Sequence, residues 1–352
     1  MEPDFRSRSG LCIKDVKNTW PRSALTFFAA ILCLFSHLLE AAADEAAKTW
    51  AERLGWPPQK RVVIFHADDV GMCCEANLAA QSALSTRQYR SASAMVPCPW
   101  FNEMAAWCRN HPSFDVGLHL TLTSEWKYYR WGPVAPHDQV KGLVDPLGYF
   151  FADVRSVAFS ASAAEVATEI HAQLARARRL GMEPTHIDTH MGTVYARPDY
   201  TQAYLRLAME EHIPAMVIQM TPYTIDKFRK QGYPITDSSL KLLDSYKQPK
   251  LDDFHAVVEA KTYEEKRERF FEQIRLFRPG LNEIIFHPSK ETEGLKRITN
   301  SWQQRVWEAR LFADPAVQQF IKQNEIIVTD WKEVMARFKK ADGRSQSDTR
   351  DS

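Results

Sequence analysis

The chain has almost no excess of charge of either sign. Among its 352 residues, 45 Lys and Arg stand against 44 Asp and Glu, so the formal net charge is +1. No overall field therefore favours a nucleic acid or an anionic membrane as a partner. Cysteine is also scarce: the six cysteines form no Cys-x-x-Cys pair, which gives no support to a zinc site built from thiolates. With no internal repeat, 45% hydrophobic and 25% charged residues, the composition is that of an ordinary globular protein, long enough for one α/β barrel or two smaller domains.

The first 43 residues have the pattern of a secretory signal peptide. Basic residues precede an apolar run over residues 24–39, and Ala41–Ala43 then offer a cleavage site of small residues. An uncleaved membrane anchor is the alternative, but His37, Glu40 and the alanines favour cleavage. We therefore expect an exported protein, periplasmic or secreted, without a stable membrane span once the signal is removed.

Strand and helix patterns alternate along the rest of the chain. The best-defined helix is expected from Ser162, which caps it, to Gly181, which ends it. The alternation predicts a barrel-like α/β fold, which need not be complete or regular, with a metal site at the C-terminal ends of its strands. We expect one such domain over residues 44–338, followed by a polar, disordered tail over residues 339–352. The expected strands are residues 61–65, 92–96, 115–120, 185–188, 215–218, 283–286 and 325–328.

Two segments interrupt this alternation and are interpreted as insertions. Residues 121–160 are rich in aromatic residues, Gly and Pro, and residues 221–253 form a looser polar stretch. A long insertion after a catalytic strand often forms a wall or lid of the cleft. Its aromatic side chains would either stack on a sugar or pack locally. They are Trp126, Tyr128, Tyr129 and Trp131.

An acidic pair marks the end of the first strand. Asp68 and Asp69 follow an apolar run in FHADDVG. Because neighbouring residues of a strand point in different directions, one carboxylate can bind a metal ion while the other faces the substrate and acts as a base. A turn or helix-cap role is the simpler alternative for such a pair, but histidines at other strand ends favour a site.

Histidines stand at or near the ends of three further strands. His119 lies in an apolar strand, where a lone His is more often a core residue with a backbone partner. His186 and His190 bracket Asp188 in THIDTH, and strand alternation puts these three residues on one face. Two imidazoles and a carboxylate suit Zn²⁺ and related ions, with a further residue orienting a ligand from behind. His287, at the end of another strand, is placed where a general acid could protonate a leaving amine.

Four segments together resemble the YdjC/ChbG family of carbohydrate deacetylases. They are HADDVGM, VGLHLTLT, PTHIDTH and IIFHPS, in the order in which the family has them, and they span residues 61–290. The resemblance implies a barrel-like α/β fold and removal of acetyl groups from N-acetylated amino sugars with a divalent metal ion, Zn²⁺ or Mg²⁺. The site residues that it implies are the metal ligands Asp69, His119 and His190, the base Asp68 and the acid His287.

The chain departs from the family pattern at two places. Family members continue the HIDSH-like motif with further histidines, whereas here His190 is followed by Met-Gly-Thr-Val. His66 also stands where the family often has Asn. These departures bear on how the substrate is oriented and on the acid step. We expect His66, His186 and Asp188 to lie behind the metal ligands or beside the substrate.

The leading hypothesis is a metal-dependent hydrolase that removes an acetyl group from an N-acetylated sugar. The alternatives are an O-deacetylase, a hydrolase of another amide or of a glycosidic bond, and a carbohydrate-binding protein without catalysis. A base retained beside a metal triad argues against the last of these. The sequence leaves open the sugar, the metal and the oligomeric state, a homo-oligomer included. It also leaves open whether disulfides form among Cys73, Cys74, Cys98 and Cys108.

Overall fold

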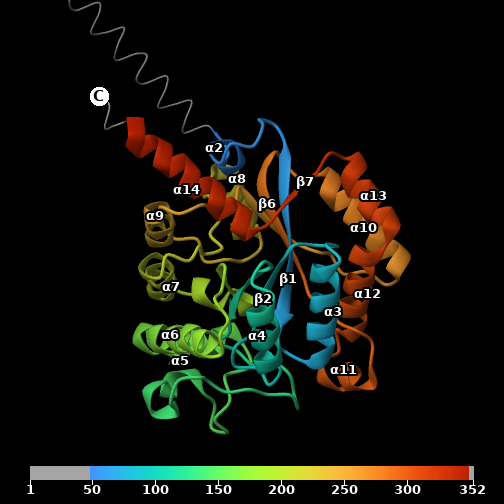
Figure 1. Cartoon of the computed structure of the whole chain (residues 1–352). Coiled ribbons are helices and arrows are strands. Elements are labelled where there is room, and N and C mark those ends of the chain that lie inside the picture. The colour runs from blue at the N-terminus through green and yellow to red at the C-terminus, as the bar shows by residue number, and fades with distance from the viewer. Residues whose placement is uncertain (1–47, 349–352) are drawn as a thin grey trace, which may run out of the picture. The chain divides into compact units, whose positions relative to one another are not determined.

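Parallel strands form a curled, barrel-like sheet in residues 48–348, the part of the chain that the computed structural model describes (Figure 1). The seven strands of this part are β1 Arg61–Val70, β2 Ser91–Ala94, β3 Asp115–Leu120, β4 Ile187–Thr189, β5 Asp253–Ala256, β6 Gly280–Phe286 and β7 Ile327–Thr329. Their order in the sheet is β4-β3-β2-β1-β6-β5, and β7 pairs with the first half of β1. The predicted barrel-like α/β fold is confirmed.

Helices cover the outer side of the sheet (Figure 1). The α-helices are α2 Trp50–Arg53, α3 Cys74–Ser85, α4 Phe101–Asn110, α5 Val154–Ser160, α6 Ala163–Arg179, α7 Pro198–Glu210, α8 Pro222–Lys230, α9 Asp237–Ser245, α10 Tyr263–Arg275, α11 Glu293–Ile298, α12 Trp302–Ala313, α13 Pro315–Gln323 and α14 Trp331–Asp348. Short 3-10 turns lie at His137–Gln139, Lys141–Leu143 and His190–Tyr195. Along one side α7 packs against α6 and α9, and elsewhere α10 packs against α12 and α13.

The layered arrangement follows from the sequence of its elements. Val62–Phe65 of β1 are buried because helices cover one face of the strand and the sheet interior covers the other, as is usual for parallel strands. α6 begins with the predicted cap: the Ser162 hydroxyl accepts from the Glu165 backbone N–H, and the Glu165 carboxylate accepts from the Ser162 N–H. The helix ends before Gly181, whose φ of 82° suits glycine.

A short segment between α7 and α8 lies between β4 and the start of β5. Residues 215–218, predicted as a strand, make only isolated bridges, Ala215 with Ile187 and Ile218 with Leu251. Met216 N–H donates to the Ile187 carbonyl at 2.9 Å, and Leu251 N–H donates to the Val217 carbonyl at 2.7 Å. The segment therefore connects β4, at one end of the sheet order, with the residues just before β5, at the other end.

The C-terminal segment is helical where disorder was predicted. α14 continues to Asp348, so the predicted disordered tail is helix over residues 339–348. The helix is anchored because Trp331 and Val334 are fully buried near its start. Residues 349–352 and the predicted signal peptide lie outside the described residues. The strand β5 and the helices α5, α8, α9, α11, α13 and α14 were not predicted.

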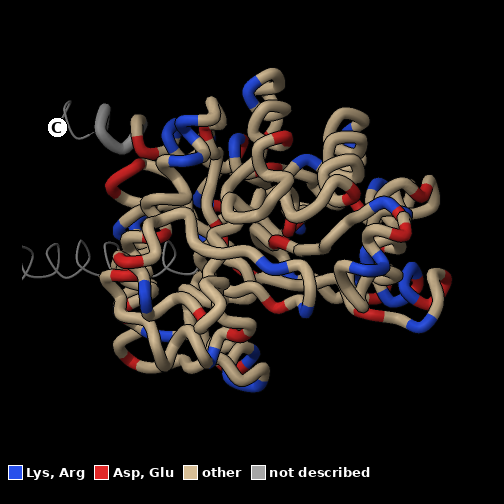
Figure 2. The backbone as a smooth tube through the Cα atoms, turned by 90° about the horizontal axis from the view of Figure 1, so that it is seen from below, with Lys and Arg blue, Asp and Glu red and all other residues tan. Residues whose placement is uncertain are grey.

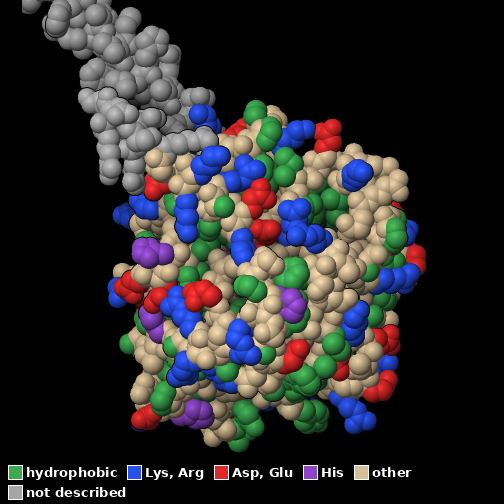
Figure 3. All heavy atoms as spheres, in the orientation of Figure 1, with side chains coloured by type: hydrophobic (Ala, Val, Ile, Leu, Met, Phe, Trp, Pro, Cys, Tyr) green, Lys and Arg blue, Asp and Glu red, His purple; other side chains and the backbone are tan. Residues whose placement is uncertain are grey.

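Charged side chains of both signs are mixed over the molecule. Lys and Arg are interspersed with Asp and Glu over the backbone in Figure 2, and the face seen in Figure 3 shows the same mixture. This distribution agrees with the near-zero net charge. None of the helices in residues 48–348 is long and apolar enough to cross a membrane.

Candidate active site

The end of β1 is irregular, and this irregularity brings both members of the acidic pair into one cavity. The pairing of β1 with β2 shifts register between Ala67 and Val70, and Asp69 has a φ of 61°, in the left-handed region. Asp68 and Asp69 therefore both line a cavity of about 540 Å³, instead of diverging as strand neighbours do. Holding a non-glycine residue in this region costs on the order of 1–3 kcal/mol, and such strain concentrates at functional sites.

Asp69, His119 and His190 meet at this end of the sheet. Asp69 Oδ1 lies 3.2 Å from His190 Nδ1 and 3.4 Å from His119 Nε2. The two ring nitrogens are 3.3 Å apart. All three side chains are buried, and they come from the ends of β1, β3 and β4. The structure thus gathers the three residues that the resemblance implied as metal ligands.

Each of the two imidazoles is oriented by a carboxylate on its other ring nitrogen. His119 Nδ1 lies 2.7 Å from Asp188 Oδ1, and His190 Nε2 lies 3.1 Å from Glu125 Oε2. When these nitrogens carry the protons, His119 Nε2 and His190 Nδ1 keep lone pairs that face Asp69. Metal-binding histidines are commonly fixed in this way by a carboxylate behind them.

The donor set fits a divalent transition metal. Two ligand atoms about 2.1 Å from Zn²⁺ at a tetrahedral angle lie about 3.4 Å apart, and the three donor separations here are 3.2, 3.3 and 3.4 Å. Asp68 Oδ1 and Asp69 Oδ1 are buried and accept no hydrogen bond from the residues that the structure describes, which is costly unless a cation compensates. Asp69, His119 and His190 could therefore hold the ion. Asp68, His119 and Asp188 form an overlapping group.

The two neighbouring carboxylates have different electrostatic environments. Arg305, on α12, donates from Nη2 to Asp69 Oδ2 at 2.7 Å. Burial alone would raise the pKa of Asp69, but Arg305 and His190 hold it well below its usual range. Burial raises the pKa of Asp68, and the nearby His119 only partly opposes this. Asp69 is thus the carboxylate that stays ionised, and Asp68 is the better proton acceptor.

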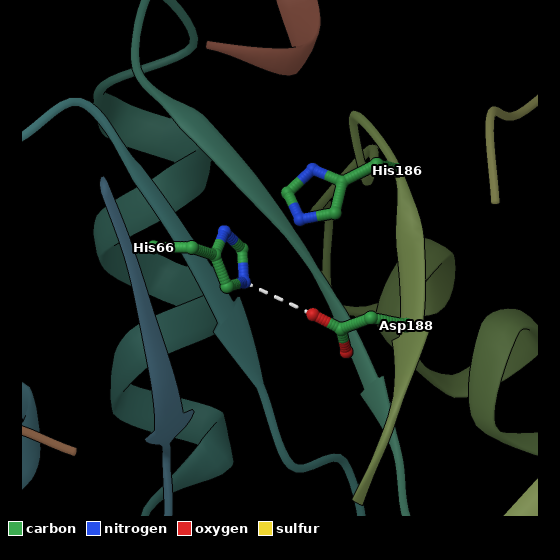
Figure 4. Close-up of side chains that lie close together, drawn as sticks. All are labelled: His66, His186 and Asp188. Atoms are coloured by element: carbon green, nitrogen blue, oxygen red, sulfur yellow. Dashed lines mark ion pairs between the residues drawn. The ribbon is translucent and has the colours of Figure 1, made fainter. Parts of the chain in front are cut away.

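His66 points toward the Asp188 carboxylate (Figure 4) and contacts the oxygen that does not face His119. His66 Nε2 lies 3.0 Å from Asp188 Oδ2. Burial alone would lower the pKa of His66, but the hydrogen bond to Asp188 and the charge of Glu283 raise it to about 10. A continuous chain of contacts therefore runs from His66 through Asp188 to His119.

His186 lies beside this pair, and its Nδ1 is 3.5 Å from Asp115 Oδ1. Its ring stacks on Trp331 with ring centroids 5.6 Å apart. The ring has room because position 117 is glycine: a Cβ there would lie 2.5 Å from His186 Nε2. His186, His66 and Asp188 are close enough to form a further group of potential metal ligands. Unlike Asp188, however, neither His186 nor His66 is among the described residues that line the cavity.

His287 lines the same cavity from the end of β6. Its backbone N–H donates to Glu308 Oε2 at 2.6 Å, and its Nδ1 lies 3.8 Å from the same oxygen. Lys266, which is buried, donates to Glu308 Oε1 at 2.9 Å. Burial alone would raise the pKa of Glu308, but His287 and Lys266 lower it to about 2. The ionised Glu308 carboxylate therefore lies next to the His287 imidazole, which lines the cavity.

Glu308→Gln is expected to lower the free energy of unfolding at pH 7 by about 3–5 kcal/mol, because it leaves Lys266 buried without a counter-charge. Since the folded-state pKa is depressed to about 2, the ionised carboxylate stabilises the protein above its ordinary pKa, and this contribution is lost as the pH falls through the folded value. The difference between wild type and variant should therefore shrink from pH 5 to pH 3. Urea denaturation across this range measures it, with Glu272→Gln, at an exposed position of α10, as control. A difference independent of pH would contradict the assignment.

The predicted aromatic wall is only partly in the cavity. Trp126 lines it. Trp131 is buried and meets the His190 ring edge-on at a centroid distance of 6.5 Å. It therefore packs against a candidate metal ligand and is not placed to stack on a sugar. Tyr129 is partly buried, and its hydroxyl donates to a backbone carbonyl. Tyr128 is 82% exposed and is not among the described residues that line the cavity.

Known proteins resemble this chain over most of its described length. A family model described as YdjC-like protein matches residues 62–323. The chain belongs to the YdjC-like family. A carbohydrate deacetylase of Thermus thermophilus is 32% identical over 270 residues, which are 74% of this chain and 89% of that protein. A carbohydrate deacetylase of Thermoanaerobacter pseudethanolicus is 26% identical over 77% of this chain and 98% of that protein. A proposed cellobiose-phosphate cleavage protein of Enterococcus faecalis shares the fold, with a TM-score of 0.64 and 21% identity over 78% of this chain and 99% of that one.

Membership of the YdjC-like family confirms the predicted resemblance, and the structure shows what occupies the departure after His190. Met191 and Gly192 have φ values of 52° and 66° and form a left-handed turn. Both line the cavity, and Met191 is 48% exposed. A thioether therefore stands in the cavity wall where the family pattern led us to expect imidazoles.

Three residues of the site were missed in the sequence. Glu125 had a usable signal, because it is an acidic residue shortly after β3, at the same edge of the sheet as the acidic pair at the end of β1. Arg305 and Glu308 had none: they lie on α12, and Arg305 is 236 residues from its partner Asp69. The four cysteines within residues 48–348 are free thiols.

Proposed function

We propose that the protein is a metal-dependent hydrolase that removes acetyl groups from N-acetylated amino sugars. The observation that carries the proposal is the pair of carboxylates in unlike environments, Asp68 and Asp69, beside two imidazoles whose free nitrogens face Asp69. The names of the relatives in the YdjC-like family support the reaction and the sugar.

The residues divide the work of amide hydrolysis. A divalent ion held by Asp69, His119 and His190 supplies, when bound, the polarisation of an amide carbonyl. Asp68 takes the proton from the attacking water, since it is the carboxylate not neutralised by Arg305. His287 gives a proton to the nitrogen as the C–N bond breaks. The products are acetate and the free amino sugar.

Acetate release from a panel of N-acetylated and O-acetylated sugars tests this function. The protein is stripped of metal and then reloaded with Zn²⁺, Mg²⁺ or another divalent ion. We expect release from N-acetyl sugars that disappears on stripping and returns on reloading. Release from O-acetyl sugars alone, or new reducing ends without acetate, would replace the proposal with another hydrolase. Sugar binding with bound metal and no turnover would replace it with a binding protein.

A further inference from the structure

The cavity has two chemically different halves. The ends of β1, β3 and β4 supply the carboxylates and imidazoles described above. The opposite part of the sheet, formed by residues 215–220, β5 and β6, supplies mainly apolar side chains at alternate positions, as strand geometry requires; Glu283 and His287 flank Ile285 at the end of β6. The apolar side chains are Met216, Ile218, Met220, Phe254 and Ile285.

The insertion at residues 221–253 completes the apolar half. Phe228 of α8 and Leu243 of α9 line the cavity, and Tyr233 and Ile235 line it from the connection between these helices. Met191 adds a further apolar side chain next to His190. The total volume of about 540 Å³ is in the range of about 300–1,000 Å³ that holds drug-sized ligands. It therefore has room for more than an acetyl group.

Most polar side chains in this half already have hydrogen-bond partners within the protein, including Glu283, which accepts from the Trp331 indole at 2.9 Å. Among the described residues that line it, the Tyr195 hydroxyl donates to the Met216 carbonyl, and the Thr201 hydroxyl donates to the Val194 carbonyl. The Ser239 hydroxyl shares a hydrogen bond with Thr236. Sugar hydroxyls placed here would find few partners to replace their hydrogen bonds to water. An alkyl group would instead gain about fourfold in affinity for each methylene buried.

We propose that the substrate carries an apolar group attached to its acylated amino sugar, and that this group occupies the half lined by Met220, Phe254 and Ile285. The inference rests on the proposed function and names the substrate class of the same site. The group is either an alkyl aglycone or a longer N-acyl chain. Either way water adds to the acyl carbon, the C–N bond breaks and the nitrogen takes a proton, so the products are a carboxylate and the free amine.

Two matched substrate series test this inference with the metal-loaded full chain. The first is the methyl, butyl and hexyl glycosides of N-acetylglucosamine, and the second is its methyl glycoside with N-acetyl, N-butanoyl or N-hexanoyl groups. Release of the primary amine gives kcat/KM. We expect kcat/KM to rise at least about tenfold from the shortest to the longest member of one series. The series that responds identifies the source of the apolar group.

A variant and a turnover-free measurement sharpen the test. Met220→Ser should reduce the ratio of kcat/KM for the longest and shortest substrates, whereas Met209→Ser, at a partly exposed position of α7 outside the cavity, should keep it. Calorimetry on metal-free protein should show tighter binding of the hexyl than of the methyl glycoside, or of the N-hexanoyl than of the N-acetyl sugar. Activity that is equal across both series would overturn the inference and leave the proposed function intact. Absence of amine release from every substrate, with the chain-length difference in binding preserved, would instead overturn the proposed function.

Discussion

His190→Ala is expected to abolish both bound metal and hydrolysis while leaving the protein folded. The change removes one of three donors and leaves Glu125 without its imidazole partner. Loss of a residue that only orients a metal ligand costs about 10–100-fold, so loss of the ligand itself should lower kcat/KM by more, on the order of 10³-fold. Metal content per protein, measured by elemental mass spectrometry after dialysis against Zn²⁺, and amine release are the two readouts.

The matched control for this variant is His171→Ala. His171 lies on α6 with an exposed side chain that contacts the Ala167 carbonyl within its own helix. It should retain full metal content and activity, and both variants should unfold cooperatively. A His190→Ala protein that binds one equivalent of metal, or that hydrolyses N-acetyl sugars at the wild-type rate, would remove His190 from the ligand set.

Much of the candidate site could be predicted because its residues stand at strand ends. Parallel strands bring their C-terminal ends to one edge of the sheet, so Asp69, His119 and His190 could be expected to meet although they are far apart in the sequence. The continuous apolar run of residues 215–218 likewise indicated an extended segment there.

The remaining features depend on tertiary contacts that no local pattern reports. The φ of Asp69 and the register shift of β1 turn both carboxylates into the cavity, where strand alternation predicts that they diverge. The pairing of Arg305 with Asp69 is set by the docking of α12. α14 begins at Trp331, which occupies a buried site and donates from its indole to Glu283 at 2.9 Å, and the helix continues into the segment whose polar composition suggested disorder.

Asp68→Asn is expected to remove hydrolysis and to keep the metal. The amide has the shape of the carboxylate but cannot accept the proton of the attacking water, so kcat should fall by about 10²–10⁴-fold. Metal content should remain near one equivalent, because Asp69, His119 and His190 are untouched. The same two measurements used for His190→Ala read out both effects.

The neighbouring substitution, Asp69→Asn, makes this test discriminating. It should remove both metal and activity, since Asp69 Oδ1 is the oxygen nearest both imidazole nitrogens. If Asp68→Asn lost its metal as well, Asp68 would be a ligand in the overlapping group with His119 and Asp188, and the base would have to be sought elsewhere. Asp68 and Asp69 are neighbours in the chain but have different partners, His66 for Asp68 and Arg305 for Asp69. The two Asn variants should therefore separate metal binding from catalysis.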